Sequence, residues 1–221
     1  MSVPAALAVF KDLCLDATDA SRAAQFWAAA LGLQVSADHG SAVRLDGPAP
    51  QHTVWINAVP EPHTVKNRMH LDVHTGSVES LVALGATVLE EFRRWTMMAD
   101  PDGGEFCAFV RDPVPEGRLY EIVLDAHDPE RLTRWWAEVL GGRVDAEDGA
   151  WGVEDVPGAP FDYLVLSPTD EPKTVKNRVH LDVHADVAAL VAAGATVVAS
   201  LPDWTVLADP EGNEFCAFPP R

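Results

Sequence analysis

The feature that most constrains this chain is an internal repeat. The segment TVKNRMHLDVH at residues 64–74 returns as TVKNRVHLDVH at residues 174–184, with only Met69 replaced by Val179. The segments GATV and ADPxGxEFCAF also occur twice, and each keeps the same spacing of about 110 residues. A period of that length is the size of a domain and is much longer than a solenoid or propeller repeat.

The repeat predicts two homologous domains, residues 1–111 and 117–221. The segment between them, RDPVPEG, contains two prolines and a glycine, which interrupt helices and strand ladders. Residues 112–116 are therefore predicted to be a short linker.

Periodicity predicts the same order of elements twice in each copy: a strand, a helix and several further strands. The segment VFKDLCLD alternates as a strand does, and the next segment predicts a helix that begins after Asp19 and ends at Gly32. NRMHLDVH alternates in the same way, and the DPxG segment is typical of a turn. The predicted fold class is α+β, with four βαβββ units in the chain.

Composition limits the partners that the chain can bind. Its 16 Lys and Arg residues against 34 Asp and Glu residues give a net charge of -18, which disfavours nucleic acids and anionic membranes. No apolar run approaches the roughly 20 residues of a membrane span, and we expect no signal peptide. The three cysteines lack the close spacing of a zinc or redox motif, which favours a reduced, cytoplasmic setting. The expected partner is a small molecule, with a homodimer left open.

The double βαβββ plan, the helix ends FWAAALG and WWAEVLG, and the closing segment ADPEGNEF resemble the vicinal oxygen chelate superfamily. The chain looks most like its glyoxalase-like branch, which stands beside bleomycin-resistance proteins and extradiol dioxygenases, and the resemblance covers nearly the whole chain. It implies tandem domains, each built of two βαβββ units that form a curved mixed sheet around a cavity. It also implies metal ligands on the first and last strands of each unit.

The resemblance carries over to this sequence position by position. The family's strand histidine matches His70 and His180, and its opening-strand position, usually His, falls on Asp12 and Glu121. Glu105 and Glu214 complete the candidate metal ligands, because they stand two residues before the closing-strand position and share its face. Cys107 and Cys216 stand where the family usually has its closing glutamate. This mixed imidazole and carboxylate set suits Zn, Mn, Fe or Ni. Glu105 and Glu214 are also the candidate catalytic residues for proton transfer.

The repeated histidine strand has two chemically different faces. The period of two places Arg68, His70, Asp72 and His74 on one face, which we expect on the concave side, while the apolar residues between them cover the helices. The candidates for substrate binding are one arginine, one aspartate and one tryptophan from each copy: Arg68, Asp72, Trp95, Arg178, Asp182 and Trp204. A solvated sheet face with Arg–Asp pairs, and core packing of both tryptophans, remain alternatives. His74 and His184 are predicted to be exposed, and Cys107 and Cys216 to be buried core thiols.

Three functions remain open from the sequence. The first is a metal-dependent lyase, isomerase or dioxygenase, as the resemblance implies. The second is a metal-free protein that sequesters a small molecule, in the manner of bleomycin-resistance proteins. The third is a pair of domains in which one cavity has lost its activity.

Overall fold

The computed structural model describes residues 6–38, 40–146 and 149–220. It contains four units, each with a strand, a helix and three further strands. The first repeat supplies β1 (Ala8–Ala17), α1 (Ala20–Leu31), β2 (Gln34–Asp38), β3 (Ala42–Asp46), the 3-10 helix η1 (Pro50–His52) and β4 (Val54–Ala58), then β5 (Met69–Thr75), α2 (Val78–Ala83), β6 (Thr87–Glu91), β7 (Thr96–Ala99) and β8 (Glu105–Val110).

The second repeat has the same order of elements. It supplies β9 (Leu119–Ala126), α3 (Pro129–Leu140), β10 (Arg143–Asp145), β11 (Trp151–Glu154) and β12 (Tyr163–Pro168), then β13 (Val179–Ala185), α4 (Val187–Ala192), β14 (Thr196–Ser200), β15 (Thr205–Ala208) and β16 (Glu214–Phe218). Residues 111–118 between the repeats are neither helix nor strand. None of the described helices is long and apolar enough to cross a membrane.

The predicted limits of the first long helix are confirmed. The Asp19 side chain accepts a hydrogen bond from the backbone N–H of Arg22 at 3.0 Å, so it satisfies a donor in the first turn. Gly32 ends the helix with a φ of 70°, in the left-handed region that glycine adopts without steric cost.

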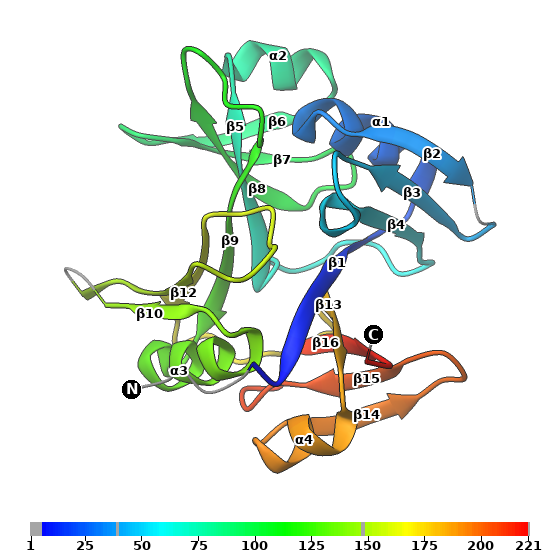
Figure 1. Ribbon diagram of the computed structural model, residues 1–221. Coiled ribbons are helices and arrows are strands. Elements are labelled where there is room, and N and C mark those ends of the chain that lie inside the picture. The colour runs from blue at the N-terminus through cyan, green and yellow to red at the C-terminus, as the bar shows by residue number, and fades with distance from the viewer. Residues whose placement is uncertain (1–5, 39, 147–148, 221) are drawn as a thin grey trace.

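The strands form two open, curved, eight-stranded mixed sheets, which confirms the α+β fold class. Sheet A has the order β14-β15-β16-β13-β1-β4-β3-β2, and sheet B has the order β10-β11-β12-β9-β5-β8-β7-β6. Each sheet therefore joins one unit of the first repeat to one unit of the second. Figure 1 shows this exchange, because β1 pairs with β4 of its own unit on one side and with β13 of the second repeat on the other.

Each long helix packs on a strand of its own repeat, although that strand belongs to the other sheet. Phe26 and Trp27 of α1 pack against Phe106 of β8, with ring centroids 5.6 and 5.4 Å apart, although β8 belongs to the other sheet. Trp136 of α3 packs in the same way on Phe215 of β16. The aromatic contacts between helix and strand therefore stay within one repeat, whereas each sheet contains strands of both repeats.

The repeated DPxG segments are turns built around a buried carboxylate. Asp209 accepts hydrogen bonds from the backbone N–H groups of Glu211 and Asn213, from the Asn213 side chain and from the Trp136 indole. Asp100 holds the first turn in the same way and accepts from the Trp27 indole at 3.0 Å. Each turn is therefore tied to the long helix of its own repeat.

Candidate functional site

The polar faces of the central strands lie opposite the helix-side core, as strand periodicity predicts. Leu181 and Val183 of β13 belong to the apolar core, whereas His180 and Asp182 face β1. Cys14 of β1 stands directly opposite His180 across the antiparallel pair. The alternation of this strand is therefore as predicted, and both repeats contribute polar side chains to this face in each sheet. That His70 and His180 line a cavity on the concave side stays a prediction.

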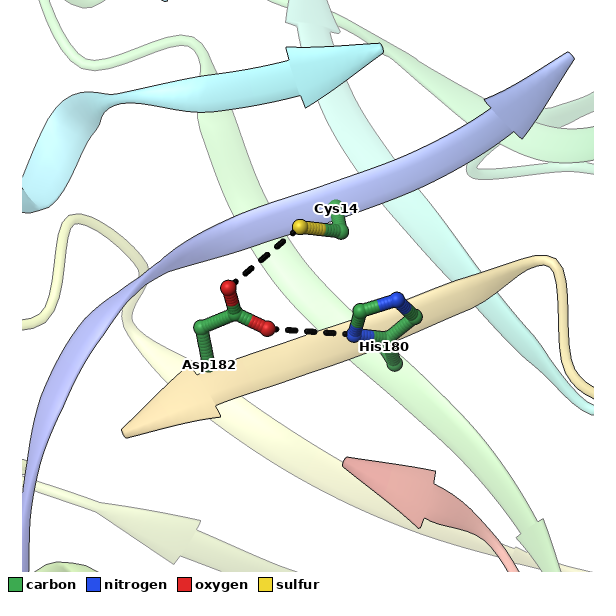
Figure 2. A group of neighbouring side chains, drawn as sticks. All are labelled: Cys14, His180 and Asp182. Carbon is green, nitrogen blue, oxygen red and sulfur yellow. Dashed lines mark hydrogen bonds and ion pairs between the residues drawn. The ribbon is translucent and has the colours of Figure 1, made fainter. Parts of the chain in front are cut away.

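The His180 cluster consists of Cys14, His180 and Asp182, and Figure 2 shows how the two strands bring them together. Asp182 lies with one oxygen 3.2 Å from His180 Nδ1 and accepts a hydrogen bond from the Cys14 thiol at 3.4 Å through the other. Burial lowers the pKa of His180, but the hydrogen bonds and charges of Asp182 and Cys216 outweigh it and raise the pKa to about 10. Burial, followed by the charge of Asp182, raises the pKa of the Cys14 thiol.

The His70 cluster in sheet B consists of His70, Asp72 and Cys107. His70 Nε2 lies 3.4 Å from Asp72 Oδ1 and 3.8 Å from the Cys107 sulfur. Asp72 Oδ1 is buried and has no hydrogen-bond partner. Burial, and then the charge of Asp72, raise the pKa of the Cys107 thiol. Cys107 and Cys216 are buried, as predicted. The cysteines of the two clusters, Cys14 and Cys107, lie beside a histidine and outside the apolar core.

Cavity A opens beside the first half of β1 and has a volume of about 590 Å³. We define it by the polar and aromatic side chains on its wall: Lys11, Asp12, Arg44, Trp55 and His184. The bulge between Phe10 and Asp12 in the β1–β13 pairing accompanies the exit of Lys11 onto this wall. Strict alternation from the sequence would have placed Lys11 with Leu13 on the opposite face.

Asp12 is the most perturbed acid on the wall of cavity A. Its Oδ2 accepts hydrogen bonds from Lys11 Nζ at 2.6 Å and from the Trp55 indole at 3.3 Å, whereas its Oδ1 is buried without a partner. Burial, followed by the charge of Asp182, raises its pKa to about 6 even though Lys11 lowers it. Asp12 can therefore exchange a proton near neutral pH.

The equivalent place in sheet B is filled by aromatic rings. Tyr120 stands where sheet A has Lys11, and its ring stacks on His74 at 4.5 Å and meets the edge of Phe109 at 5.1 Å. Trp95 stacks on Phe109 at 6.0 Å. His74 is consequently buried, which corrects the prediction that it would be exposed. Its pKa is lowered because burial disfavours the imidazolium.

The structure places the opening-strand acids beside the aspartates of the histidine strands of the other repeat. Asp12 lies next to Asp182 of β13, and Glu121 stands opposite Asp72 of β5. Burial, followed by the charge of Asp72, raises the pKa of Glu121 to about 7. The two equivalent acids, Asp12 and Glu121, therefore each lie beside the histidine strand of the other repeat.

The glutamates of the closing strands lie away from both clusters. Glu105 accepts a hydrogen bond from the backbone N–H of Asn67 at 3.0 Å and lies 3.4 Å from His63. Glu214 accepts from the backbone N–H of Asn177 at 3.1 Å and forms an ion pair with Lys173 at 2.8 Å. Both carboxylates hold the loop that enters a histidine strand, and neither belongs to a group of three potential metal ligands among the described residues.

The remaining candidates for substrate binding are also spread over several places. Arg68 and Arg178 line a different cavity, between the repeats. Trp204 stacks on Phe218, and the Lys11 ammonium group lies over the Phe218 ring, 4.1 Å from its centre. Trp204 is thus one ring removed from the wall of cavity A.

Comparison with known proteins agrees with this architecture. The sequence model of the glyoxalase-like domain matches residues 12–109 and again residues 121–218. Glyoxalase I from Zea mays has a similar fold, with a TM-score of 0.68 and 16% identity, over 96% of this chain and 92% of that one. The cppA protein from Streptococcus pneumoniae TIGR4 gives a TM-score of 0.53 and 13% identity, over 96% and 98% of the two chains. No curated protein matches the sequence.

Proposed function

Because the chain belongs to the glyoxalase-like domain family, we propose that it binds a small molecule in cavity A and that Asp12 transfers a proton on that molecule. The observation that carries this proposal is the Asp12 carboxylate on the wall of a cavity of about 590 Å³, with one oxygen, the buried Oδ1, that has no hydrogen-bond partner. A cavity of that size holds a small organic ligand. A pKa of about 6 suits a carboxylate that both takes up and releases a proton near neutral pH.

The chemistry that these side chains support is proton abstraction next to a carbonyl group. Asp12 would take a proton from the carbon, and the electron pair of the broken C–H bond would move onto the carbonyl oxygen. Lys11, which pairs with Asp12, would be released toward that oxygen as Asp12 takes up the proton, and Arg44 lies on the same wall in an ion pair with Asp46. Return of the proton to a neighbouring carbon completes an isomerisation, and loss of a leaving group completes an elimination.

The function can be tested by following hydrogen exchange in D₂O. Small α-hydroxycarbonyl compounds, such as dihydroxyacetone and glyceraldehyde, serve as probes, and NMR measures deuterium entering the carbon beside the carbonyl. We expect the wild-type protein to catalyse this exchange and Asp12→Asn to lower the rate by about 100-fold or more, because a positioned base typically contributes that much.

Glu121→Gln is the matched control, since it removes the corresponding acid from sheet B, where Tyr120 fills the cavity. We expect its exchange rate to match the wild type. Binding of the probes without exchange in the wild type would favour the metal-free sequestering function instead. Equal loss in both variants would contradict the assignment of catalysis to cavity A.

A second candidate function is a metal centre at the His70 cluster. One imidazole nitrogen, one carboxylate oxygen and one sulfur lie within 4.8 Å of one another there, and zinc and iron use these donor types. Asp72 Oδ1 has the 3.4 Å contact with His70 Nε2 but no hydrogen bond, which favours this cluster over the His180 cluster, in which hydrogen bonds occupy both Asp182 oxygens. His70, Asp72 and Cys107 would hold the ion, which would act as a Lewis acid.

Metal analysis of protein purified without an affinity tag tests this second candidate. We expect close to one equivalent of Zn, Mn, Fe or Ni in the wild type, retention of it in His180→Ala and loss of it in His70→Ala. Less than a tenth of an equivalent in the wild type would remove the metal centre. Equal loss in both variants would mean that the ion is not held by the His70 cluster.

We also propose a reducing, cytoplasmic location for the protein. All three cysteines, Cys14, Cys107 and Cys216, are free and buried. Proteins of oxidising compartments more often pair their cysteines in disulfides.

A further inference from the structure

A second cavity lies between the two repeats and has a volume of about 720 Å³. It is lined by equivalent loops of the two copies, residues 59–68 and 169–178, together with Asp16 and Asp125. Its apolar surface comes from valines and prolines, including Val65 and Val175, which are 42% and 46% exposed. This inter-repeat cavity is separate from cavity A, with which it shares no lining residue.

The inter-repeat cavity is rich in positive charge for so acidic a protein. Five of the chain's 16 lysines and arginines line it: Lys66, Arg68, Lys173, Lys176 and Arg178. Four of these cations form ion pairs with carboxylates: Lys66 with Asp125, Lys173 with Glu214, Lys176 with Asp16 and Arg178 with Asp102. The two other acids of the lining, Glu61 and Glu171, are exposed.

Arg68 is the exception. Its guanidinium donates hydrogen bonds to the backbone carbonyls of Glu171 and Asp125, at 2.6 and 3.1 Å, and its Nε–H has no partner. Among the described residues it has no ion pair with a carboxylate. Its charge is therefore held in place by neutral acceptors and is not neutralised.

The difference between the two arginines has a local cause. Arg178 donates to the Asp102 carboxylate at 2.6 Å, in the DPDGG turn of the first repeat. Asp102 also accepts from the backbone N–H of Thr18 at 2.9 Å, but only through Oδ1, so its Oδ2 is available to Arg178. The corresponding residue of the second repeat is Glu211, and both of its oxygens accept from backbone N–H groups, those of His127 and Asp128 at 2.7 and 2.8 Å. The Glu211 carboxylate therefore binds the backbone at the start of α3, and Arg68 has no acidic partner among the described residues.

We propose that the inter-repeat cavity is a second binding site, for a small organic anion that carries a carboxylate or phosphate group. The guanidinium of Arg68, which is fixed by two backbone carbonyls and paired with no carboxylate among the described residues, attracts the anionic group. The exposed valines and prolines of the two loops contact the apolar part of the ligand. This site does not depend on the function proposed for cavity A.

Isothermal titration calorimetry at constant ionic strength tests the site, with citrate and inorganic phosphate as the two probes. We expect at least one of them to bind with one equivalent per chain. Val175→Asp adds a negative charge to the cavity without disturbing the core and should lower the affinity by about tenfold. Arg68→Gln should lower it by at least as much, whereas Arg178→Gln should leave it within about threefold, because Asp102 already neutralises that charge.

Val197→Asp is the matched control, because Val197 is an equally exposed valine on the edge strand β14 and outside the cavity. It should bind the probe as the wild type does, and so should Asp12→Asn, which alters only cavity A. No binding of either probe by the wild type would overturn the proposal. Equal weakening by Val175→Asp and Val197→Asp would also overturn it, since the effect would then be one of net charge.

Discussion

Replacement of Asp12 by asparagine should shift the free energy of unfolding in favour of the variant, relative to the wild type, as the pH rises from about 4 to 7. The pKa of Asp12 is raised from its ordinary value of 3.8 to about 6, chiefly by burial. A group with a raised pKa binds its proton more tightly in the folded state, so its contribution to stability is complete below pH 3.8 and is lost as the pH rises through 6. Asparagine does not titrate and does not lose this contribution.

The expected size follows from the shift of about two pKa units. The difference in the free energy of unfolding between Asp12→Asn and the wild type should rise by about 2 to 3 kcal/mol over this range. Urea denaturation at half-unit steps of pH measures it. The change at any single pH also includes the lost Lys11 ion pair, and comparison across pH separates the two effects.

Glu121→Gln provides an internal reference for this measurement. The pKa of Glu121 is raised from 4.5 to about 7, so the corresponding rise should occur at a higher pH, between about 4.5 and 7. A difference for Asp12→Asn that stays constant with pH would show that Asp12 titrates normally. In that case it would be a poor proton carrier near neutral pH, and the proposed function would lose its main support.

The local structure could be predicted from the sequence because it depends on neighbouring residues. Asp19 and Gly32 set the ends of α1 through their own hydrogen bond and backbone conformation. The alternation of MHLDVH fixes which side chains face the core, since a shift by one residue would bury the charged ones there. These features need no knowledge of the rest of the chain.

The exchange of units between the sheets could not be predicted in this way. The segments that become β5 and β13 differ little, and either could pair with β1 as far as local energetics is concerned. Pairing of β1 with β13 sets Cys14 opposite His180, whereas the sequence offered Asp12 and His70 as members of one repeat. The composition of each candidate site therefore depends on long-range topology.

Two further differences at the site have local causes that the sequence only partly signals. The bulge at Lys11 moves an ammonium group onto the wall of cavity A. Glu105 and Glu214 share a sheet face with the cysteines, but the free backbone N–H groups of Asn67 and Asn177 lie closer and bind them. A count of strand positions cannot show such competition.

The repeated TVKNR segment also has an explanation in the topology. Lys66 forms an ion pair with Asp125 of the other repeat, and Lys176 forms one with Asp16 at 2.5 Å. Arg68 and Arg178 each reach a backbone carbonyl of the opposite loop. The sequence predicts that Arg68 and Arg178 bind substrate, and in the structure the first half of the motif joins the two repeats.

The largest loss of stability is expected from Asp209→Ala. Asp209 is only 2% exposed, and its removal would leave the Trp136 indole, two backbone N–H groups and the Asn213 amide without their acceptor. Unsatisfied buried donors typically cost about 1 to 3 kcal/mol each, and water can replace only some of the lost bonds.

We expect Asp209→Ala to lower the free energy of unfolding by about 3 to 4 kcal/mol, measured by urea denaturation at pH 7. Burial raises the pKa of Asp209, so removal of the charge at neutral pH offsets part of the loss. Asp100→Ala is the matched comparison, because Asp100 holds the equivalent turn but is only half-buried, and its loss should be smaller, about 2 kcal/mol. If both variants lost less than about 1 kcal/mol, the repeated DPxG turns would not be the tie between sheet and helix that their hydrogen bonds indicate.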